Sequence, residues 1–365
     1  MSIASPARLG LAVATLIALI SQVGCNDEKK TQNVTDSGVS KSQSQELDPK
    51  LGAALVASSA SASPAPKDGA PPASGIFGPG QADKVQKSGA PLVIQMGTEG
   101  AEPRVSLASS SAPDWKTPAT LTVAIQTGPQ TTTPTTGLTF GFSTESAKDK
   151  KVEDGGIAGS LKMLAKLQKV SLSATQAGPL PPNLEAELAK MKGSEIQLDL
   201  QRGGVNDLTM SLAKSAVPDL ELILAGAGLG FFVFAVPVPD KAVGVGATWI
   251  AQGRSDYSGF DVVSYRMYQV KAIDGDSITM SVEMREYSAS PVLKVAGIPE
   301  GAAMQAFESV GKGELTLRRG ESVARKGEYT QQLAATFPGA GQQQDRPLSM
   351  QWVSRVSIER GASKP

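Results

Sequence analysis

An apolar residue at every second position is the feature that most constrains the fold of this chain. Between residues 277 and 285 the apolar members are Ile278, Met280, Val282 and Met284. Successive side chains of a strand point to opposite faces, so this run predicts a strand with one face in a core. It follows Asp274-Gly275, a dipeptide typical of the two-residue turn of a β-hairpin. Residues 262–287 are therefore predicted to form a hairpin.

The same alternation recurs from about residue 91 to the C-terminus. It is present in residues 121–125, 195–201 and 315–317, and in a last run with apolar residues at even positions: Leu348, Met350, Trp352, Val356 and Ile358. Eight or more such runs, joined mostly by tight turns, predict a large antiparallel sheet. The fold class predicted from the residues is α+β, mostly antiparallel β.

Two segments between these runs predict short amphipathic helices. Over residues 157–169 the large apolar residues recur at a spacing typical of a helix, with three lysines on another side. Leu184, Leu188 and Met191 have the same spacing and precede Gly193, which predicts a second short helix.

Residues 220–238 are the most apolar stretch beyond the N-terminal segment. As a membrane span the stretch is poor, because Glu221, three glycines and Pro237 interrupt it. A buried helix packed on the sheet is therefore favoured, and the glycines would allow close approach.

The N-terminal segment has the layout of a secretory signal. Arg8 precedes an apolar run over residues 9–20, and small residues lead to Cys25, the single cysteine of the chain. Twelve residues of helix cover only ~18 Å, too short to span a membrane well. Val23-Gly24-Cys25 resembles the end of the lipobox of bacterial lipoproteins, in which the cysteine receives a lipid. The alternative is an ordinary secreted protein with a free thiol, and Gln22, where lipoboxes usually have Leu, departs from the pattern.

The segment after Cys25 is rich in Ser, Ala and Pro and nearly free of large apolar residues. Such a composition cannot bury enough surface to offset the entropy of ordering, so it predicts a disordered tether. A flexible chain of ~65 residues has a root-mean-square reach of roughly 45 Å. The expected organisation is a signal peptide over residues 1–24, a tether over 25–90 and a folded part over 91–365, with possible related halves over 91–235 and 236–360.

Composition excludes several classes of chemistry. The 365 residues contain no histidine, which excludes Ser-His-Asp and Cys-His catalysis and histidine-ligated metal sites. One cysteine excludes an intramolecular disulfide. Lys and Arg together number 35, as do Asp and Glu, and no basic run is present. A nucleic-acid partner is therefore not expected, and neither a metal nor another cofactor is.

Catalytic motifs are weak in this sequence. Ser211 and Lys214, and again Ser309 and Lys312, match the Ser-x-x-Lys pattern of penicillin-interacting enzymes, but no Lys-Thr-Gly follows either pair. Carboxylates are numerous, yet no pair is marked by its surroundings as the acid and base of a glycoside hydrolase. A histidine-free hydrolase therefore remains only an alternative.

A further resemblance concerns the folded part as a whole. The stretch Lys-Ala-Val-Gly-Val-Gly-Ala-Thr-Trp over residues 241–249, the tyrosine-bearing strand after it and the hairpin at Asp274-Gly275 resemble uncharacterised bacterial lipoproteins. Gly-Ala-Glu-Pro-Arg over residues 100–104 is similar to these long-tethered proteins too. Their domain of unknown function resembles the half-barrel of lipoprotein carriers. The resemblance implies a curved sheet or half-barrel with a few short helices on its concave face, and no catalytic residue.

The function expected from the sequence is that of a non-catalytic lipoprotein of the bacterial cell envelope, anchored to a membrane at Cys25. Asn26 after the cysteine favours the outer membrane if Gram-negative sorting rules apply. The alternative is a carrier or binder of a hydrophobic ligand, a lipid or an acyl chain, and an envelope protein is a further possible partner. Four residues of the most apolar stretch would line a ligand cavity or fill it as core: Leu224, Phe231, Phe232 and Phe234.

Overall fold

The computed structural model describes residue 72 and residues 74–107, 119–128, 136–146, 160–173, 183–201, 204–257, 260–292, 303–338 and 347–361. In these ranges the chain forms one 12-stranded sheet. Its strands are β1 (Val93–Thr98), β2 (Ala119–Gly128), β3 (Thr136–Ser146), β4 (Ser160–Ser173), β5 (Glu195–Gln201), β6 (Gly204–Ser211), β7 (Thr248–Tyr257), β8 (Phe260–Asp274), β9 (Ser277–Ser288), β10 (Ala306–Arg318), β11 (Lys326–Phe337) and β12 (Leu348–Gly361).

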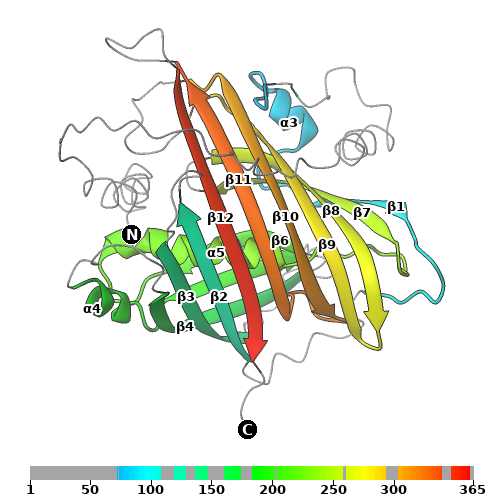
Figure 1. The fold of residues 1–365 in the computed structure, drawn as a ribbon, viewed down its shortest axis with the longest axis horizontal. Coiled ribbons are helices and arrows are strands. Elements are labelled where there is room, and N and C mark those ends of the chain that lie inside the picture. The colour runs from blue at the N-terminus through cyan, green and yellow to red at the C-terminus, as the bar shows by residue number, and fades with distance from the viewer. Residues whose placement is uncertain are drawn as a thin grey trace, which may run out of the picture.

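All neighbouring strands of the sheet are antiparallel, in the order β1-β7-β8-β9-β10-β11-β12-β2-β3-β4-β5-β6. Figure 1 shows the long strands β8 to β12 side by side and the sheet curling around α5. The predicted fold class, a mostly antiparallel β half-barrel with a few short helices, is confirmed. Strands β7 to β12 are neighbours in sequence order, and so are strands β2 to β6. The two runs meet where β12 pairs with β2. At the edge of the sheet opposite β6, β1 pairs with β7.

The predicted hairpin is confirmed as β8 and β9, which turn at Gly275 with φ of 55°. Only glycine adopts such a left-handed conformation readily, which is why this position suits the turn. The apolar residues of β9 at even positions are buried, from Ile278 to Met284. In β12 the described even positions include Val356 and Ile358, and both are buried.

The helix expected over residues 157–169 is wrong, because this segment forms strand β4 between β3 and β5. Met163, Ala165 and Leu167 are fully buried, while Lys162 and Lys166 are exposed. The buried residues of this segment therefore recur at every second position, as in a strand. Leucines spaced by three residues resemble a helical pattern, and the buried alanine between them carries little hydrophobic signal.

Three α-helices lie in the described ranges: α3 (Gln81–Val85), α4 (Leu184–Ala189) and α5 (Glu221–Phe234). The short helix predicted near Leu184 and the buried helix predicted within residues 220–238 are confirmed as α4 and α5. Helix α5 follows a 3-10 turn (Pro218–Leu220) and lies across the strands on the concave face (Figure 1). No helix in the described ranges combines the length and the hydropathy needed to cross a membrane.

The tether expected to extend to residue 90 is wrong for residues 74–90, which pack on the sheet. Ile76 forms a bridge with Ser288, and Phe77 is 1% exposed. Phe77 and Ala82 belong to a second apolar cluster, on the face of the sheet opposite α5, with four further members: Ile250, Val263, Tyr265 and Tyr287. One well-placed aromatic ring thus anchors a segment whose average composition predicts disorder. Residues 1–71 and Cys25 lie outside the described residues.

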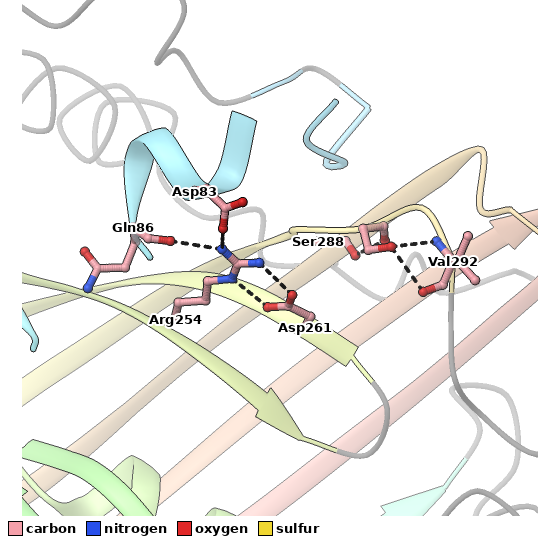
Figure 2. Close-up of polar contacts among 7 residues, drawn as sticks. Asp83, Gln86, Arg254, Asp261, Ser288 and Val292 are labelled. Atoms are coloured by element: carbon pink, nitrogen blue, oxygen red, sulfur yellow. Dashed lines mark hydrogen bonds and ion pairs between the residues drawn. The ribbon is translucent and has the colours of Figure 1, made fainter. Parts of the chain in front are cut away.

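Arg254 of β7 fastens α3 to the sheet, as Figure 2 shows. Its Nε and Nη2 atoms donate to the two carboxylate oxygens of Asp261, each at 2.8 Å. Its Nη1 atom donates to Asp83 and to the backbone oxygen of Gln86. The carboxylate partners keep the pKa of Arg254 above its ordinary value, against the opposing effect of burial. A charged clamp therefore supplements the Phe77 contact.

Tyr265→Phe is expected to flatten the alkaline loss of stability. Burial, with a smaller effect of Tyr287, raises the pKa of Tyr265 from 10.0 to about 12. Between these pH values the folded state keeps a proton that the unfolded state releases, so the free energy of unfolding falls as pH rises, by roughly 2–3 kcal/mol. Urea unfolding of both proteins between pH 9 and pH 12 measures this. If the free energy of unfolding fell equally with pH in the two proteins, the raised pKa would not belong to Tyr265, because the remaining tyrosines titrate in both proteins.

Candidate functional site

A group of polar side chains interrupts the apolar concave face of the sheet. We call it the Arg266 cluster, and its members are Ser264, Arg266 and Tyr268 of β8, Glu286 of β9, Ser309 of β10, Tyr329 and Gln331 of β11, and Ser354 of β12. Each is at most 6% exposed. Residues paired directly across strands share a face. The register therefore places the cluster beside the core residues Val282 and Met284.

Three members of the cluster form a closed hydrogen-bond triangle. The Ser309 hydroxyl donates to Oε2 of Glu286 at 2.6 Å. The Gln331 side-chain amide donates to the same carboxylate oxygen at 2.9 Å and to the Ser309 Oγ at 3.0 Å. Ser309 is thus satisfied as donor and as acceptor, which favours a fixed structural role over that of a free nucleophile.

Arg266 has a different environment from the triangle. Its Nη1 atom donates to the backbone oxygen of Phe232 at 3.0 Å, and its guanidinium carbon lies 4.5 Å from the centre of the Phe232 ring. This is cation–π geometry. Within the described part of the chain, the buried Nε and Nη2 atoms of Arg266 have no hydrogen-bond partner. The guanidinium therefore keeps two donors available on one edge.

Two tyrosines complete the cluster, and neighbouring residues fix the position of each ring. A Cβ atom at Gly311 would lie 1.7 Å from the Tyr329 hydroxyl, so the ring occupies the space that glycine leaves. The Tyr268 ring stacks on Trp249 with centroids 5.3 Å apart, and the Trp249 indole donates to the Pro237 oxygen at 2.8 Å. Both tyrosine hydroxyls are buried without a well-formed hydrogen bond among the described residues, and that of Tyr268 is close enough to the Arg266 guanidinium to interact with it.

The charge states of these tyrosines follow from their surroundings. Burial raises the pKa of Tyr268, and the charge of Arg266 acts in the opposite direction. Burial also raises the pKa of Tyr329 well above its ordinary value, with the negative charge of Glu286 adding to the effect. Both phenols are thus protonated at neutral pH and can donate hydrogen bonds.

The residues expected to contact a ligand occupy two different environments. Leu224, Phe231 and Phe234 are 0% exposed and belong to the main core, so they fill the concave face. Phe232 is only partly buried and lies against Arg266. Cys25 lies outside the described residues, so its role stays a prediction.

Arg266 was not among the residues expected from the sequence, although a signal was present. In the predicted strand, Val262, Tyr268 and Val270 fall at even positions, and Arg266 is in phase with them. A charged residue in phase with core positions is unusual in a half-buried strand and indicates a buried partner or a ligand.

The chemistry of the cluster suits recognition of an oxygen-rich anion better than hydrolysis. Among the described residues Glu286 is the one buried carboxylate, whereas glycoside hydrolysis uses two. Ser309 points to the concave face, and Lys312, three residues along the same strand, is exposed on the other face. The second Ser-x-x-Lys match, Ser309 and Lys312, therefore cannot form a catalytic pair. The described residues contain no group of three or more His, Cys, Asp or Glu side chains that could hold a metal ion.

Comparisons with known proteins give little for this chain. No protein-family model matches it, and no curated protein matches it. A solved structure of lipovitellin, concerned with lipid–protein interactions in that protein, aligns with a TM-score of 0.38 and 10% sequence identity. The alignment covers 68% of this chain and 25% of that chain, so this chain spans about a quarter of lipovitellin. A likeness this weak carries no argument about function.

Proposed function

We propose that this chain is a lipid-anchored, non-catalytic protein of the bacterial cell envelope, attached to a membrane through Cys25. The observation that carries the proposal is the position of the single cysteine, just after an apolar run of signal length and before a long Ser-, Ala- and Pro-rich segment. Asn26 supports the outer membrane as the site of attachment. The absence of histidine and the closed hydrogen bonds of Ser309 support a non-catalytic role.

Cys25→Ala is expected to abolish lipid attachment and to release the protein from membranes. The thiol is the atom that the lipid modifies, and the sequence has no second cysteine to replace it. Feeding labelled palmitate to cells that express each protein, followed by membrane fractionation, measures the effect. Gln22→Leu is the matched control and should label at least as strongly, because it restores the residue usual in lipoboxes. Equal labelling of wild type and Cys25→Ala would refute the anchor.

A second candidate function is the binding of an amphiphilic ligand by the anchored protein. The observation that favours it is the Arg266 cluster, which places unpartnered polar donors within an apolar concave face. Ligand sites commonly combine an apolar lining with a few fixed polar groups. Since Leu224, Phe231 and Phe234 fill the core, contact with the apolar part of the ligand is assigned to Phe232.

A further inference from the structure

We propose that Arg266 binds the oxyanion of an amphiphilic ligand, a carboxylate or a phosphodiester, through its Nε and Nη2 atoms. The proposal rests on the second candidate function, amphiphile binding, and specifies the polar end of that ligand. It starts from a side chain that is 1% exposed and has two donor atoms without partners in the described residues. Buried donors without acceptors are costly, so an anion that accepts hydrogen bonds from these two atoms would stabilise the protein.

Two other arginines of this protein show what the same edge binds. Nε and Nη2 of Arg254 donate to both carboxylate oxygens of Asp261, each at 2.8 Å. Nε and Nη2 of Arg325 donate to both carboxylate oxygens of Glu321, at 2.9 Å and 2.6 Å. Paired parallel hydrogen bonds of this kind are typical of arginine with carboxylate or phosphate. Arg266 presents the same two atoms, more deeply buried and without a hydrogen-bond partner within the described ranges.

Glu286 is the buried acidic residue on the same face as Arg266, two positions beyond Met284, which pairs with Arg266. Oε2 of Glu286 accepts hydrogen bonds from Ser309 and Gln331. Its negative charge nevertheless acts on any ligand in the cluster. One positive and one negative side chain together favour an anion with a single charge over one with two.

Further donors of the cluster suit the same group. The hydroxyls of Ser264 and Tyr329 are buried and lack partners in the part of the chain that the structure describes, and the buried hydroxyl of Tyr268 interacts with the Arg266 side chain. Both tyrosines share the concave face with Arg266, and their interaction with it affects their pKa values. Phe232, stacked over the guanidinium, offers an apolar surface beside the charge. A monoanionic head group with an apolar chain is therefore the ligand class that fits.

The test is calorimetric titration of the full chain carrying Cys25→Ala, which removes the anchor. The probes are oleate, a lysophospholipid with a phosphodiester head group, oleyl alcohol as the uncharged analogue, and acetate and phosphate as anions without a chain. We expect oleate or the lysophospholipid to bind, and Arg266→Met to weaken this binding about 10- to 100-fold, the range of a charge-assisted pair. Arg325→Met, which removes a comparable pair at the surface, should leave binding unchanged.

If Arg266→Met does not fold, Arg266→Lys keeps the charge but loses the paired geometry, and should bind at least fivefold more weakly.

The outcomes separate the two proposals. Equal binding of oleate or lysophospholipid by the parent and both Arg266 variants would overturn the role of Arg266 and leave amphiphile binding intact. No binding of any probe would overturn both. Binding of acetate or phosphate as tight as that of oleate would support the oxyanion site and overturn the amphiphile, and oleyl alcohol binding as tightly as oleate would overturn the oxyanion.

Discussion

Phe231→Ala is expected to lower the free energy of unfolding by about 3–5 kcal/mol, the range for removing a buried aromatic ring. Phe231 lies in α5, is 0% exposed and packs edge-on against Phe142 of β3, with ring centres 5.2 Å apart. The strands around it are held by continuous ladders of backbone hydrogen bonds, so the space left by the ring cannot close easily. Urea unfolding monitored by circular dichroism measures the loss.

Phe232→Ala is the matched control for this substitution. The two rings are adjacent in α5, but Phe232 is only partly buried, and its backbone oxygen still accepts the Arg266 hydrogen bond after truncation. A loss of about 1–2 kcal/mol is expected, from the transfer free energy of the part of the ring that is buried and from the cation–π contact. If both variants lose the same amount, Phe231 does not fill a packed core, and the ligand-lining role would regain support.

The fold was largely predictable because the strands carry a local signal. Burial of one face places an apolar residue at every second position of a strand. The hairpin adds a turn at Gly275, whose left-handed backbone conformation few other residues adopt. The prediction failed for β4, where Ala165 occupies a core position without the hydrophobicity that marks one. It also failed for residues 74–90, where the burial of Phe77 and the bond between Asp83 and Arg254, both made with distant strands, outweigh the local composition.

The candidate site could not be predicted in the same way, because its members meet only through the register of several strands. Glu286 and Ser309 are 23 positions apart in the sequence, and Glu286 and Gln331 are 45 apart. No local pattern encodes those distances. The sequence does show which face of its strand each polar residue occupies. Most charged residues alternate with the core positions, whereas Arg266 is on the same face as the core residue Val270.

Gly311→Ala is expected to destabilise the protein by about 3 kcal/mol, at the upper end of the usual range for overpacking. The new Cβ atom would lie 1.7 Å from the Tyr329 hydroxyl and 2.3 Å from the ring carbon that bears it. Tyr329 is 2% exposed, so the ring has no free space to enter without displacing core neighbours. Because Tyr329 belongs to the Arg266 cluster, the same change should also weaken the binding of any ligand held there. Urea unfolding gives the first effect and calorimetric titration the second.

The matched control is Gly141→Ala in β3, another strand glycine, where the added atom would meet its nearest neighbours at 3.9 Å and 4.0 Å. This is ordinary van der Waals contact, and the alanine restricts the unfolded chain, so a change within about 1 kcal/mol is expected. In Tyr329→Leu the clash partner is removed, so Gly311→Ala should cost at least about 1 kcal/mol less in that background than in the parent. An identical cost in both backgrounds would show that the glycine is required for the backbone of β10 and not for the Tyr329 ring.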